Sequence, residues 1–565
     1  MQPINLFNFK IMLKTIFTSF LTCGLALLGF SQAKVSSEFK TTLGTPYQVI
    51  DANDKYYFNK GEEILTIKID RREAFIQKLN SKTLKFIEKK VFKDFIPDDG
   101  KLEEVAEFNG RYFVFYSLWA KPFEQLFCKE IDFAKCEAIG KDRLLLKTDK
   151  KITAMGGVTF GFGGFGFVGG GKFSFSLSFD KKKVLIKYRV KPEKKDDNIS
   201  YDIIGMTVFD DGMIANWGKE VKMPYTEKKM NNLDYTLDGQ GNAYILTTVY
   251  NDNSTKLELD GKVNFHIELL KIEAKTANIK TTIVDLKDKY INKIWLDEDK
   301  SGQIICAGYY SKRVRELEDA DGLFMFKLDK EGKVYNIITH EIPVSVLNQY
   351  ASERTQKRNA KADEKGKADF ADLVLRDIIL QDDGSVVLIG EQHYVNVITY
   401  YTQYGMRTRT EIYYNDILVS KINANGTLAW MQKLGKRQFS AGGSGLSFWG
   451  LGINTYRQGG MGFKYMSKNG SHYMLFLDNV KNMELPLNKE PKRHIDGLGG
   501  FMTAYKLDDK SGQVSKLSLF DTRDVQGTEV YQFNVDRILS LSGSEFVVEV
   551  YKKKKEDVLI KVTLE

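Results

Sequence analysis

The sequence predicts an all-β protein built from repeated antiparallel hairpins. The stretch DILVSKINANGTLAWMQKLG, residues 416–435, shows the repeated pattern: an alternating apolar run, a break at residues 423–426, and a second apolar run. Alternation with a period of two is typical of β-strands, and Asp, Asn and Gly favour the tight turn between them. The recurrence of this pattern along the chain indicates many short strands joined by hairpin turns.

Seven hairpins of this kind follow one another through the sequence. They begin at Phe75, Leu126, Ile203, Ile267, Leu323, Asp416 and Phe501. A second hairpin of the same type precedes most of them, and four of these begin at Tyr235, Ile294, Asp377 and Phe463. Two hairpins per unit give four antiparallel strands, and successive four-stranded units are the building blocks of a β-propeller.

The two ends of the chain indicate how such a ring closes. After the seventh hairpin, residues 533–565 supply three more strands, and residues 35–43 could supply the fourth. We therefore expect eight blades rather than seven, with the ring closed by an N-terminal strand. A two-domain β arrangement is the main alternative, because the spacing of the units is irregular.

Two of the seven turns carry a further signature. Residues 210–217 and 423–430 contain an acid or amide, then a glycine, then Trp217 or Trp430. These turns resemble those of quinoprotein-type repeats, and the resemblance implies the architecture of a secreted β-propeller repeat protein. It implies no functional residues, since no residues match a quinone site or the Trp-Asp signature of WD repeats. We expect no cofactor.

The first 33 residues have the pattern of a cleaved export signal. Lys10 and Lys14 precede an apolar stretch over residues 16–30, and Ser31-Gln32-Ala33 places small residues where a signal peptidase cuts. A membrane anchor would need about 20 uninterrupted apolar residues. We expect residues 34–565 to form one periplasmic or extracellular propeller domain without a transmembrane segment.

The net charge bears on the kind of partner, and the cysteines bear on whether the chain contains a disulfide. The net charge of +9 comes from lysines scattered among nearly as many acids, so we expect no nucleic-acid partner. Cys128 and Cys136 lie symmetrically about Asp132, at the centre of a predicted hairpin turn. In an exported protein they could form a disulfide. Two reduced cysteines are the equal alternative.

Five insertions interrupt the repeats, at residues 155–171, 344–370, 395–414, 440–463 and 480–500. The first and fourth are rich in glycine and aromatic residues, with Phe448, Trp449 and Tyr456 in the fourth. They could cover the propeller mouth as a lid or plug, or form a ligand platform. The second is a short, polar, helical insertion. We expect most of these loops on one face of the ring, because the turns of the other face are short.

The third insertion predicts an extended hairpin that projects from the ring. It alternates β-branched and aromatic residues around Gly405. Tyr and Arg are enriched where proteins bind one another. The candidate binding residues here are Tyr394, Tyr400, Tyr401, Tyr404, Arg407, Arg409 and Tyr413. The alternative is a hairpin that packs its tyrosines on its own neighbour.

The sequence contains no strong catalytic motif. The five histidines have no metal-ligand spacing, so we expect no metal site, and no Gly-x-Ser-x-Gly motif occurs. Glu391 and His393 are the best single candidates for catalysis, because they end a strand near the insertions. We expect a non-catalytic propeller that binds a protein or carbohydrate partner. The alternatives are an extracellular polymer-degrading hydrolase or lyase, and a structural component of a cell-envelope assembly.

Overall fold

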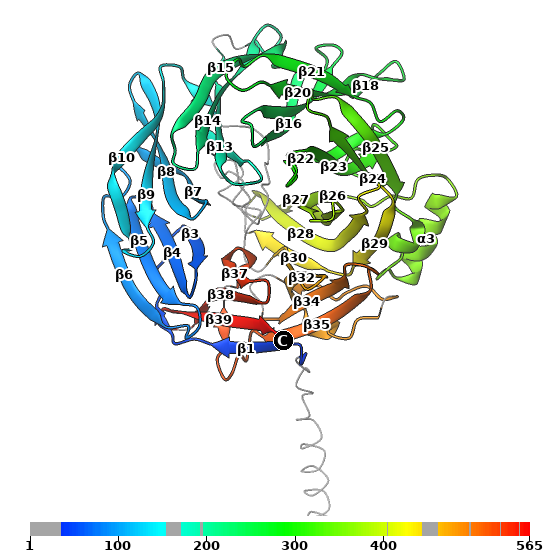
Figure 1. Ribbon diagram of the computed structural model, residues 1–565. Helices are drawn as coiled ribbons and strands as arrows, with labels where there is room; N and C mark the ends of the chain where they lie inside the picture. The colour runs from blue at the N-terminus through cyan, green and yellow to red at the C-terminus, as the bar shows by residue number, and fades with distance from the viewer. Residues whose placement is uncertain are drawn as a thin grey trace, which may run out of the picture.

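A computed structural model describes residues 36–153, 171–192, 196–403, 405–442, 461–486, 488–495, 499–531, 533–552 and 554–565. Figure 1 shows sheets that follow one another in chain order around a ring. Within the described ranges there are eight sheets of at least four strands and one two-stranded hairpin. This confirms the predicted all-β, propeller-like fold. The sheets are numbered 1 to 8 below.

The first half of the chain forms sheets 1 to 4. Sheet 1 contains β3 (Asp54–Lys60), β4 (Glu63–Asp70), β5 (Glu73–Asn80) and β6 (Phe86–Phe92). Sheet 2 contains β7 (Gly100–Phe108), β8 (Arg111–Ala120), β9 (Phe123–Asp132) and β10 (Glu137–Thr148). Sheet 3 contains β11 (Ile152–Thr153), β12 (Phe173–Leu177), β13 (Lys183–Val190), β14 (Tyr201–Asp210) and β15 (Ala215–Thr226). Sheet 4 contains β16 (Met230–Leu237), β17 (Ala243–Tyr250), β20 (Phe265–Ile272) and β21 (Ile279–Val284), with the small hairpin β18 (Glu258–Leu259) and β19 (Lys262–Val263) between β17 and β20.

The second half forms sheets 5 to 8. Sheet 5 contains β22 (Tyr290–Glu298), β23 (Ile304–Ser311), β24 (Gly322–Leu328) and β25 (Val334–Glu341). Sheet 6 contains β26 (Leu373–Leu380), β27 (Val386–Thr402), β28 (Gly405–Ile422), β29 (Leu428–Leu434), β30 (Gln438–Gly442) and β33 (His494–Ile495). Sheet 7 contains β31 (Lys464–Lys468), β32 (Ser471–Asp478), β34 (Phe501–Asp508) and β35 (Val514–Asp521). Sheet 8 contains β36 (Val530–Tyr531), β37 (Ile538–Ser542), β38 (Glu545–Lys552) and β39 (Glu556–Leu564), joined by β1 (Phe39–Leu43) and β2 (Tyr47–Gln48).

The few helical segments lie in the connections. The insertion between sheets 5 and 6 holds α2 (Val344–Leu347) and α3 (Glu353–Asp363), which lies on the outside of the ring (Figure 1). None of the residues of α3 is buried, and the Ser352 side chain caps its first turn by accepting a hydrogen bond from the Thr355 amide. Two 3₁₀ turns, η3 (Val480–Asn482) and η4 (Val535–Arg537), are the other helical segments among the described residues. No described helix is long and apolar enough to cross a membrane.

The apolar core is divided among the interfaces between neighbouring sheets. Eight clusters of buried hydrophobic residues each draw their members mainly from two sheets that are adjacent in the ring, including one cluster between sheets 1 and 8. Each four-stranded sheet therefore covers both of its faces with its two neighbours. This is the packing that a propeller requires, because such a sheet cannot bury two faces alone.

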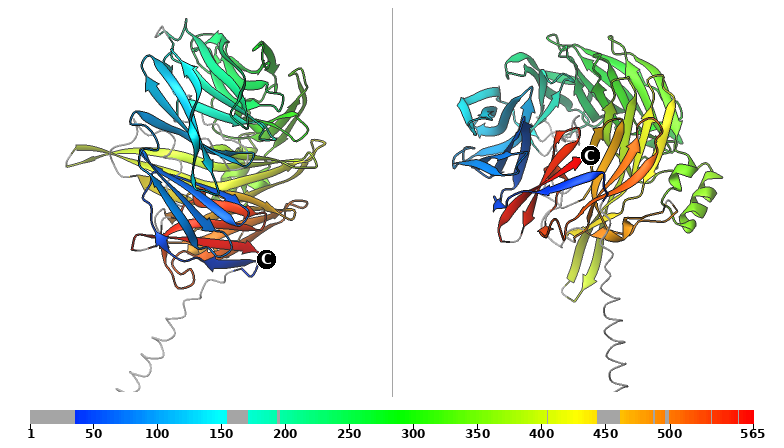
Figure 2. Two further views of the ribbon diagram at one scale, coloured as in Figure 1. Left: turned by 60° about the vertical axis from the view of Figure 1, so that its left-hand side comes forward. Right: turned by 60° about the horizontal axis from the view of Figure 1, so that its bottom comes forward.

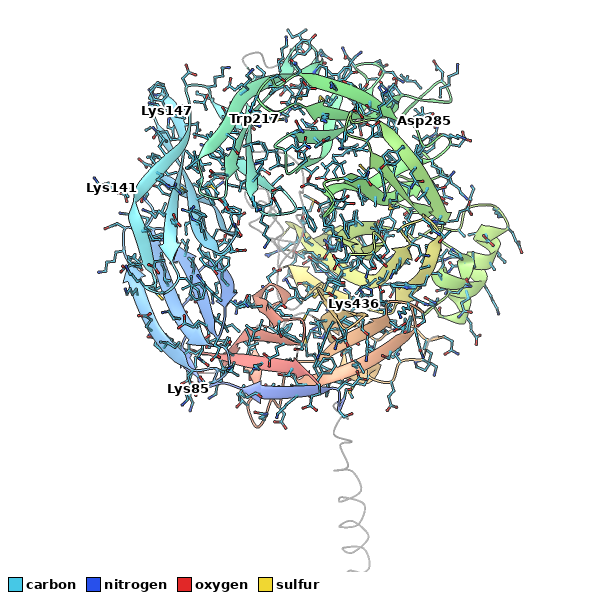
Figure 3. All side chains as sticks on the ribbon, in the orientation of Figure 1. Lys85, Lys141, Lys147, Trp217, Asp285 and Lys436 are labelled. Carbon is cyan, nitrogen blue, oxygen red and sulfur yellow. The ribbon has the colours of Figure 1, made fainter. Side chains whose placement is uncertain are left out.

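The two signature tryptophans lie at these interfaces. Trp430 of sheet 6 donates from Nε1 to the Asp509 carbonyl of sheet 7 at 2.9 Å, and Trp217 of sheet 3 donates to the Gly241 carbonyl of sheet 4 at 2.9 Å. Figure 3 labels Trp217. Gly512 has φ +68° and lies against the Trp430 ring, where an added Cβ would be 2.5 Å from Cγ. Glycine thus serves both the turn and the docking of the indole.

The two ends of the described chain meet in sheet 8. Strand β1 pairs antiparallel with β39, from Phe39 opposite Leu564 to Leu43 opposite Ile560. A buried charged group joins sheet 8 to sheet 1: Lys68 Nζ lies 2.6 Å from Glu549 Oε1, and both side chains are fully buried. Tyr47 and Tyr57 each donate to Glu549 at 2.6 Å. Burial alone would raise the pKa of Glu549, but Lys68 outweighs it and lowers this pKa to about 2.

The disulfide between Cys128 and Cys136 does not form in this structure. Both thiols are free and buried. Within the β9–β10 hairpin, Arg143 and not Cys136 lies opposite Cys128. Cys136 lies in the turn, with its Sγ 3.4 Å from Glu88, and belongs to a different core cluster from Cys128. Symmetry about Asp132 was misleading because the turn covers residues 133–136 and pairs Asp132 with Glu137, so Cys136 is a turn residue with no partner position in β9.

Candidate binding surface on a projecting hairpin

Strands β27 and β28 extend well beyond sheet 6. They pair continuously from Val386 opposite Ile422 to Thr402 opposite Gly405, with one irregularity between Glu391 and His393. Residues up to Gln392 lie within the sheet, beside β26. The outer part, residues 393–403 and 405–414, leaves the ring (Figure 2) and is called the projecting hairpin.

The projecting hairpin has two chemically different faces, because residues directly opposite each other in an antiparallel pair point to the same side. One face, called the apolar face, contains Val395, Val397, Thr399, Tyr401, Met406, Thr408, Thr410 and Ile412. The other, called the Tyr/Arg face, contains Tyr394, Asn396, Ile398, Tyr400, Arg407, Arg409, Glu411 and Tyr413. Of the described binding residues predicted from the sequence on this hairpin, Tyr401 lies on the apolar face and the others lie on the Tyr/Arg face.

The outer half of the apolar face is exposed. Val397 is 52% exposed, Met406 65% and Tyr401 83%. Large apolar side chains gathered on one exposed surface are typical of interaction sites. Valine and methionine at alternate positions of the sequence indicate such an apolar face. The prediction relied on the tyrosine and arginine residues instead.

The Tyr/Arg face divides into a packed base and an exposed end. At the base, the rings of Tyr394 and Tyr413 stack with centroids 4.6 Å apart, and Tyr413 lies 5.2 Å from Phe439 of β30. The Tyr413 hydroxyl donates to Glu411 at 2.8 Å, and Arg409 pairs with the same carboxylate. Toward the tip, Tyr400 and Arg407 are exposed. The packed alternative therefore describes the base of this face, and the exposed end remains the candidate contact surface.

Several predicted residues lie outside the described residues. These are Tyr404, Phe448, Trp449 and Tyr456, together with most of the insertions at residues 155–171 and 440–463. Of the insertion at residues 480–500, the described part contains η3 and β33, which pairs in parallel with β30. Strand β30 in turn pairs with residues 410–414 of β28.

Glu391 lies in a buried ionic group at the base of the projecting hairpin. Its side chain is 1% exposed, and its two oxygens lie 2.7 Å from Arg376 Nε and 2.7 Å from Lys436 Nζ. Burial would raise the pKa of Glu391, but Lys436 and Arg376 outweigh it and hold the pKa below its usual value. An ionised, enclosed carboxylate of this kind has no direct access to a substrate, so Glu391 is a structural residue here.

His393 also lies at the base of the projecting hairpin, packed against a neighbouring side chain. Its ring packs edge to face on Tyr414, with centroids 4.6 Å apart. Burial lowers the pKa of His393 to about 4, so the imidazole is neutral at physiological pH. The sequence correctly placed Glu391 and His393 next to the insertion, but burial could not be read from it.

Lys436 connects this group to the surrounding backbone. Figure 3 labels Lys436 on sheet 6. Its Nζ also donates to the Tyr414 carbonyl and to Gln438 Oε1, each at 3.0 Å. Gln438 donates to the Leu477 carbonyl of sheet 7 at 2.8 Å. The ionic group therefore fixes the base of the projecting hairpin to two sheets. Arg376, Lys436 and Gln438 had no motif that would reveal this role.

Three further carboxylates lie on the first strands of sheets 4, 5 and 6. Asp234 (β16), Asp297 (β22) and Asp377 (β26) each accept a backbone hydrogen bond at 2.7 to 3.0 Å. Burial raises the pKa of Asp234 and of Asp377 to about 7, and it raises that of Asp297 well above the usual value. These groups make the inner side of sheets 4 to 6 sensitive to pH.

A further acidic group, Glu316, Asp319 and Asp369, has its oxygens close enough to hold a cation. Arg313 already pairs with Glu316 and Asp369. Its guanidinium supplies the positive charge that a metal ion would otherwise provide.

No family model and no curated protein matches this chain. Among solved structures, the chain is similar to the Dos1 propeller, with 9% identity, a TM-score of 0.38, and coverage of 92% of this chain and 94% of that one. It is also similar to the polysaccharide lyase Uly1, with 9% identity, a TM-score of 0.35, and coverage of 95% and 94%. For dipeptidyl peptidase 4 of Porphyromonas gingivalis the values are 11%, 0.38, 90% and 61%. The fold assignment depends on the sheet topology and not on these neighbours.

Proposed function

We propose that this protein is an exported, non-catalytic β-propeller that binds a protein or carbohydrate partner through its projecting hairpin. In this proposal the eight sheets are eight blades, β1 closes the ring, and the ring serves as a rigid platform for the hairpin. The protein then works in the periplasm or outside the cell.

The observation that carries the proposal is that the apolar face is buried near the ring and exposed toward the tip of the hairpin. Its outer residues Val397, Tyr401 and Met406 are more than half exposed. Folding alone gives no reason to keep three such side chains together in water, because each loses the free energy that burial would provide. Covering them with a partner would recover that free energy.

The buried ionic group at the base supports the same function. By tying Glu391, Arg376 and Lys436 together, it fixes the direction in which the hairpin leaves the ring. A surface that is ordered before binding loses less conformational entropy when the partner arrives. A rigid hairpin with tyrosine, arginine, valine and methionine side chains suits a protein surface, and its exposed tyrosines could also stack on a sugar ring.

Affinity capture from cell-envelope extract and culture medium tests this proposal. In the test variant, Asn-Gly replaces residues 397–410, so that Asn396 and Glu411, which already face each other, flank a two-residue turn. The stacked Tyr394 and Tyr413 remain in place. We expect the native protein to enrich a partner that this variant does not.

A matched control shortens another exposed hairpin, β18–β19 of sheet 4. This control should capture the same partner as the native protein. Equal capture by the native protein and the tip-shortened variant would contradict the proposal. Turnover of a polysaccharide panel by the purified protein would overturn its non-catalytic part.

A further inference from the structure

The outer part of β27 has one edge that pairs with no strand among the described residues. Strand β26 ends its pairing with β27 at Leu373 opposite Gln392, and beyond that point no described strand pairs with this edge. On the other side of the projecting hairpin, β30 covers residues 410–414 of β28. Among the described residues, the outer side of residues 394–401 of β27 therefore presents backbone N–H and C=O groups that can accept another strand.

This edge carries none of the usual protection against strand pairing. Natural proteins protect exposed edges with charged residues, proline, bulges or short strands. Residues 394–402, YVNVITYYT, contain no charged residue and no proline, although 28% of the chain is charged. The last strands of other sheets differ: β6 has Lys89 and Lys90, and β10 has Lys141 and Lys147.

We infer that this edge pairs with the same edge of a second copy of the chain, in antiparallel orientation, about a two-fold axis at Ile398. Such pairing places Val395 opposite Tyr401, Val397 opposite Thr399, and Ile398 opposite its own copy. β-branched and aromatic cross-strand pairs of this kind stabilise antiparallel sheets. A two-fold axis requires a self-complementary surface, and this segment is one.

Charge favours a second copy at this position over contact elsewhere. The chain carries a net charge of +9, so two copies repel each other over most of their surfaces. The charged residues of the projecting hairpin, Arg407, Arg409 and Glu411, all lie on β28. The edge of β27 is therefore an uncharged surface along which two copies can approach each other. The dimer joins two hairpins into one four-stranded sheet.

The dimer and the proposed function use different surfaces. Self-pairing uses the backbone edge of β27, whereas partner capture uses the two faces of the hairpin. In the dimer the apolar faces of both copies become continuous, because Val395, Val397 and Tyr401 of each copy lie on the same side. Either inference can fail while the other stands.

Sedimentation of the purified protein at increasing concentration tests the dimer. We expect the native protein to reach twice the mass of one chain. Ile398→Lys places two ammonium groups directly opposite each other and should weaken the dimer at least about tenfold. Thr408→Lys, on β28, adds the same charge away from the edge and should leave the dimer intact.

Oxidative cross-linking gives a second, independent test. The cysteines among the described residues, Cys128, Cys136 and Cys306, are buried, so in a chain that begins after residue 33 an engineered surface thiol is the accessible one among the described residues. Ile398→Cys should form a covalent dimer, whereas Thr408→Cys should not. A native protein that sediments as one chain at all concentrations, or cross-linking through Cys at position 408 but not 398, would overturn the inference. Partner capture by the native protein, at a concentration where it sediments as one chain, shows separately whether the proposed function holds.

Discussion

The inner and outer halves of β27 and β28 consist of the same two strands in opposite environments. The inner half, beside β26, is buried in sheet 6, and at its end Glu391 is enclosed by two cations. The outer half leaves the ring and exposes Val397, Tyr401 and Met406. The alternation of side chains hardly changes along the strands, so the neighbouring sheets, and not the strand pattern, decide which half is core and which is surface.

The largest effect is expected from removing the buried carboxylate at the base. Glu391→Ala leaves Arg376 and Lys436 buried without their anion, and the loss of one partner of a buried ion pair typically costs 3 to 5 kcal/mol, so we expect about 3 kcal/mol here. Urea unfolding measures this loss. As a control, Asp382→Ala removes the partner of Lys300 in an exposed ion pair and should cause no measurable change. A similar result for both variants would show that the base is not a special structural element.

A smaller effect is expected from two positions on the same face of the hairpin. Ile412 is buried in a small cluster with Tyr414 and Met461, whereas Val397 is half exposed. Ile412→Ala should lower the free energy of unfolding by about 2 kcal/mol, because it removes buried methyl groups. Val397→Ala should change it by less than about 0.5 kcal/mol. Equal losses at both positions would contradict the boundary between core and surface drawn here.

The smallest effect concerns a second carboxylate of sheet 6, which accepts a backbone hydrogen bond but forms no ion pair with a described residue. Burial raises the pKa of Asp377 from 3.8 to about 7. Ionisation therefore costs stability as the pH rises from about 4 to about 7, and the cost is complete above pH 7. Asp377→Asn cannot ionise, and its amide oxygen can still accept the Ile378 hydrogen bond.

We therefore expect Asp377→Asn to be more stable than the native protein at pH 8, by about 1 kcal/mol for a half-buried group. The difference should disappear near pH 4, where the native carboxyl is protonated. The pH dependence of stability that Glu391 causes has the opposite sign. Its lowered pKa stabilises the fold above pH 4.5, and this contribution is lost as the pH falls through the pKa of the folded state. Thermal unfolding at a series of pH values measures both. An Asp377→Asn variant less stable than native at pH 8 would contradict this assignment.

Much of the repeated architecture was predictable because its signals are local. The hairpin over residues 416–435 appears as the end of β28, the turn at residues 423–427 and β29. Trp217 and Trp430 marked two turns that dock on the next sheet. Tyr400 and Tyr401 were correctly placed on an extended hairpin. In each case the information lies within a few residues of the feature.

The candidate site was less predictable, because its chemistry depends on distant residues. Glu391 is a catalytic candidate in the sequence, but in the structure Arg376 and Lys436 lie beside it and form ion pairs with its carboxylate. Cys128 and Cys136 are symmetric about Asp132 in the sequence, but the turn lies at residues 133–136 and Arg143 faces Cys128. The edge of β27 that no described strand pairs with could not be predicted, because it depends on the pairing with β26, which ends at Leu373 opposite Gln392.

The sequence by itself determined the all-β class, the order of the hairpins and the position of the long insertion, because alternation and turn residues act over short distances. The tertiary structure alone decided which carboxylates are buried beside cations, which are buried without them, and which strand edge stays open. These properties arise where sheets meet. Packing neighbours set the dielectric environment and the backbone pairing of each residue, and those neighbours come from distant parts of the chain.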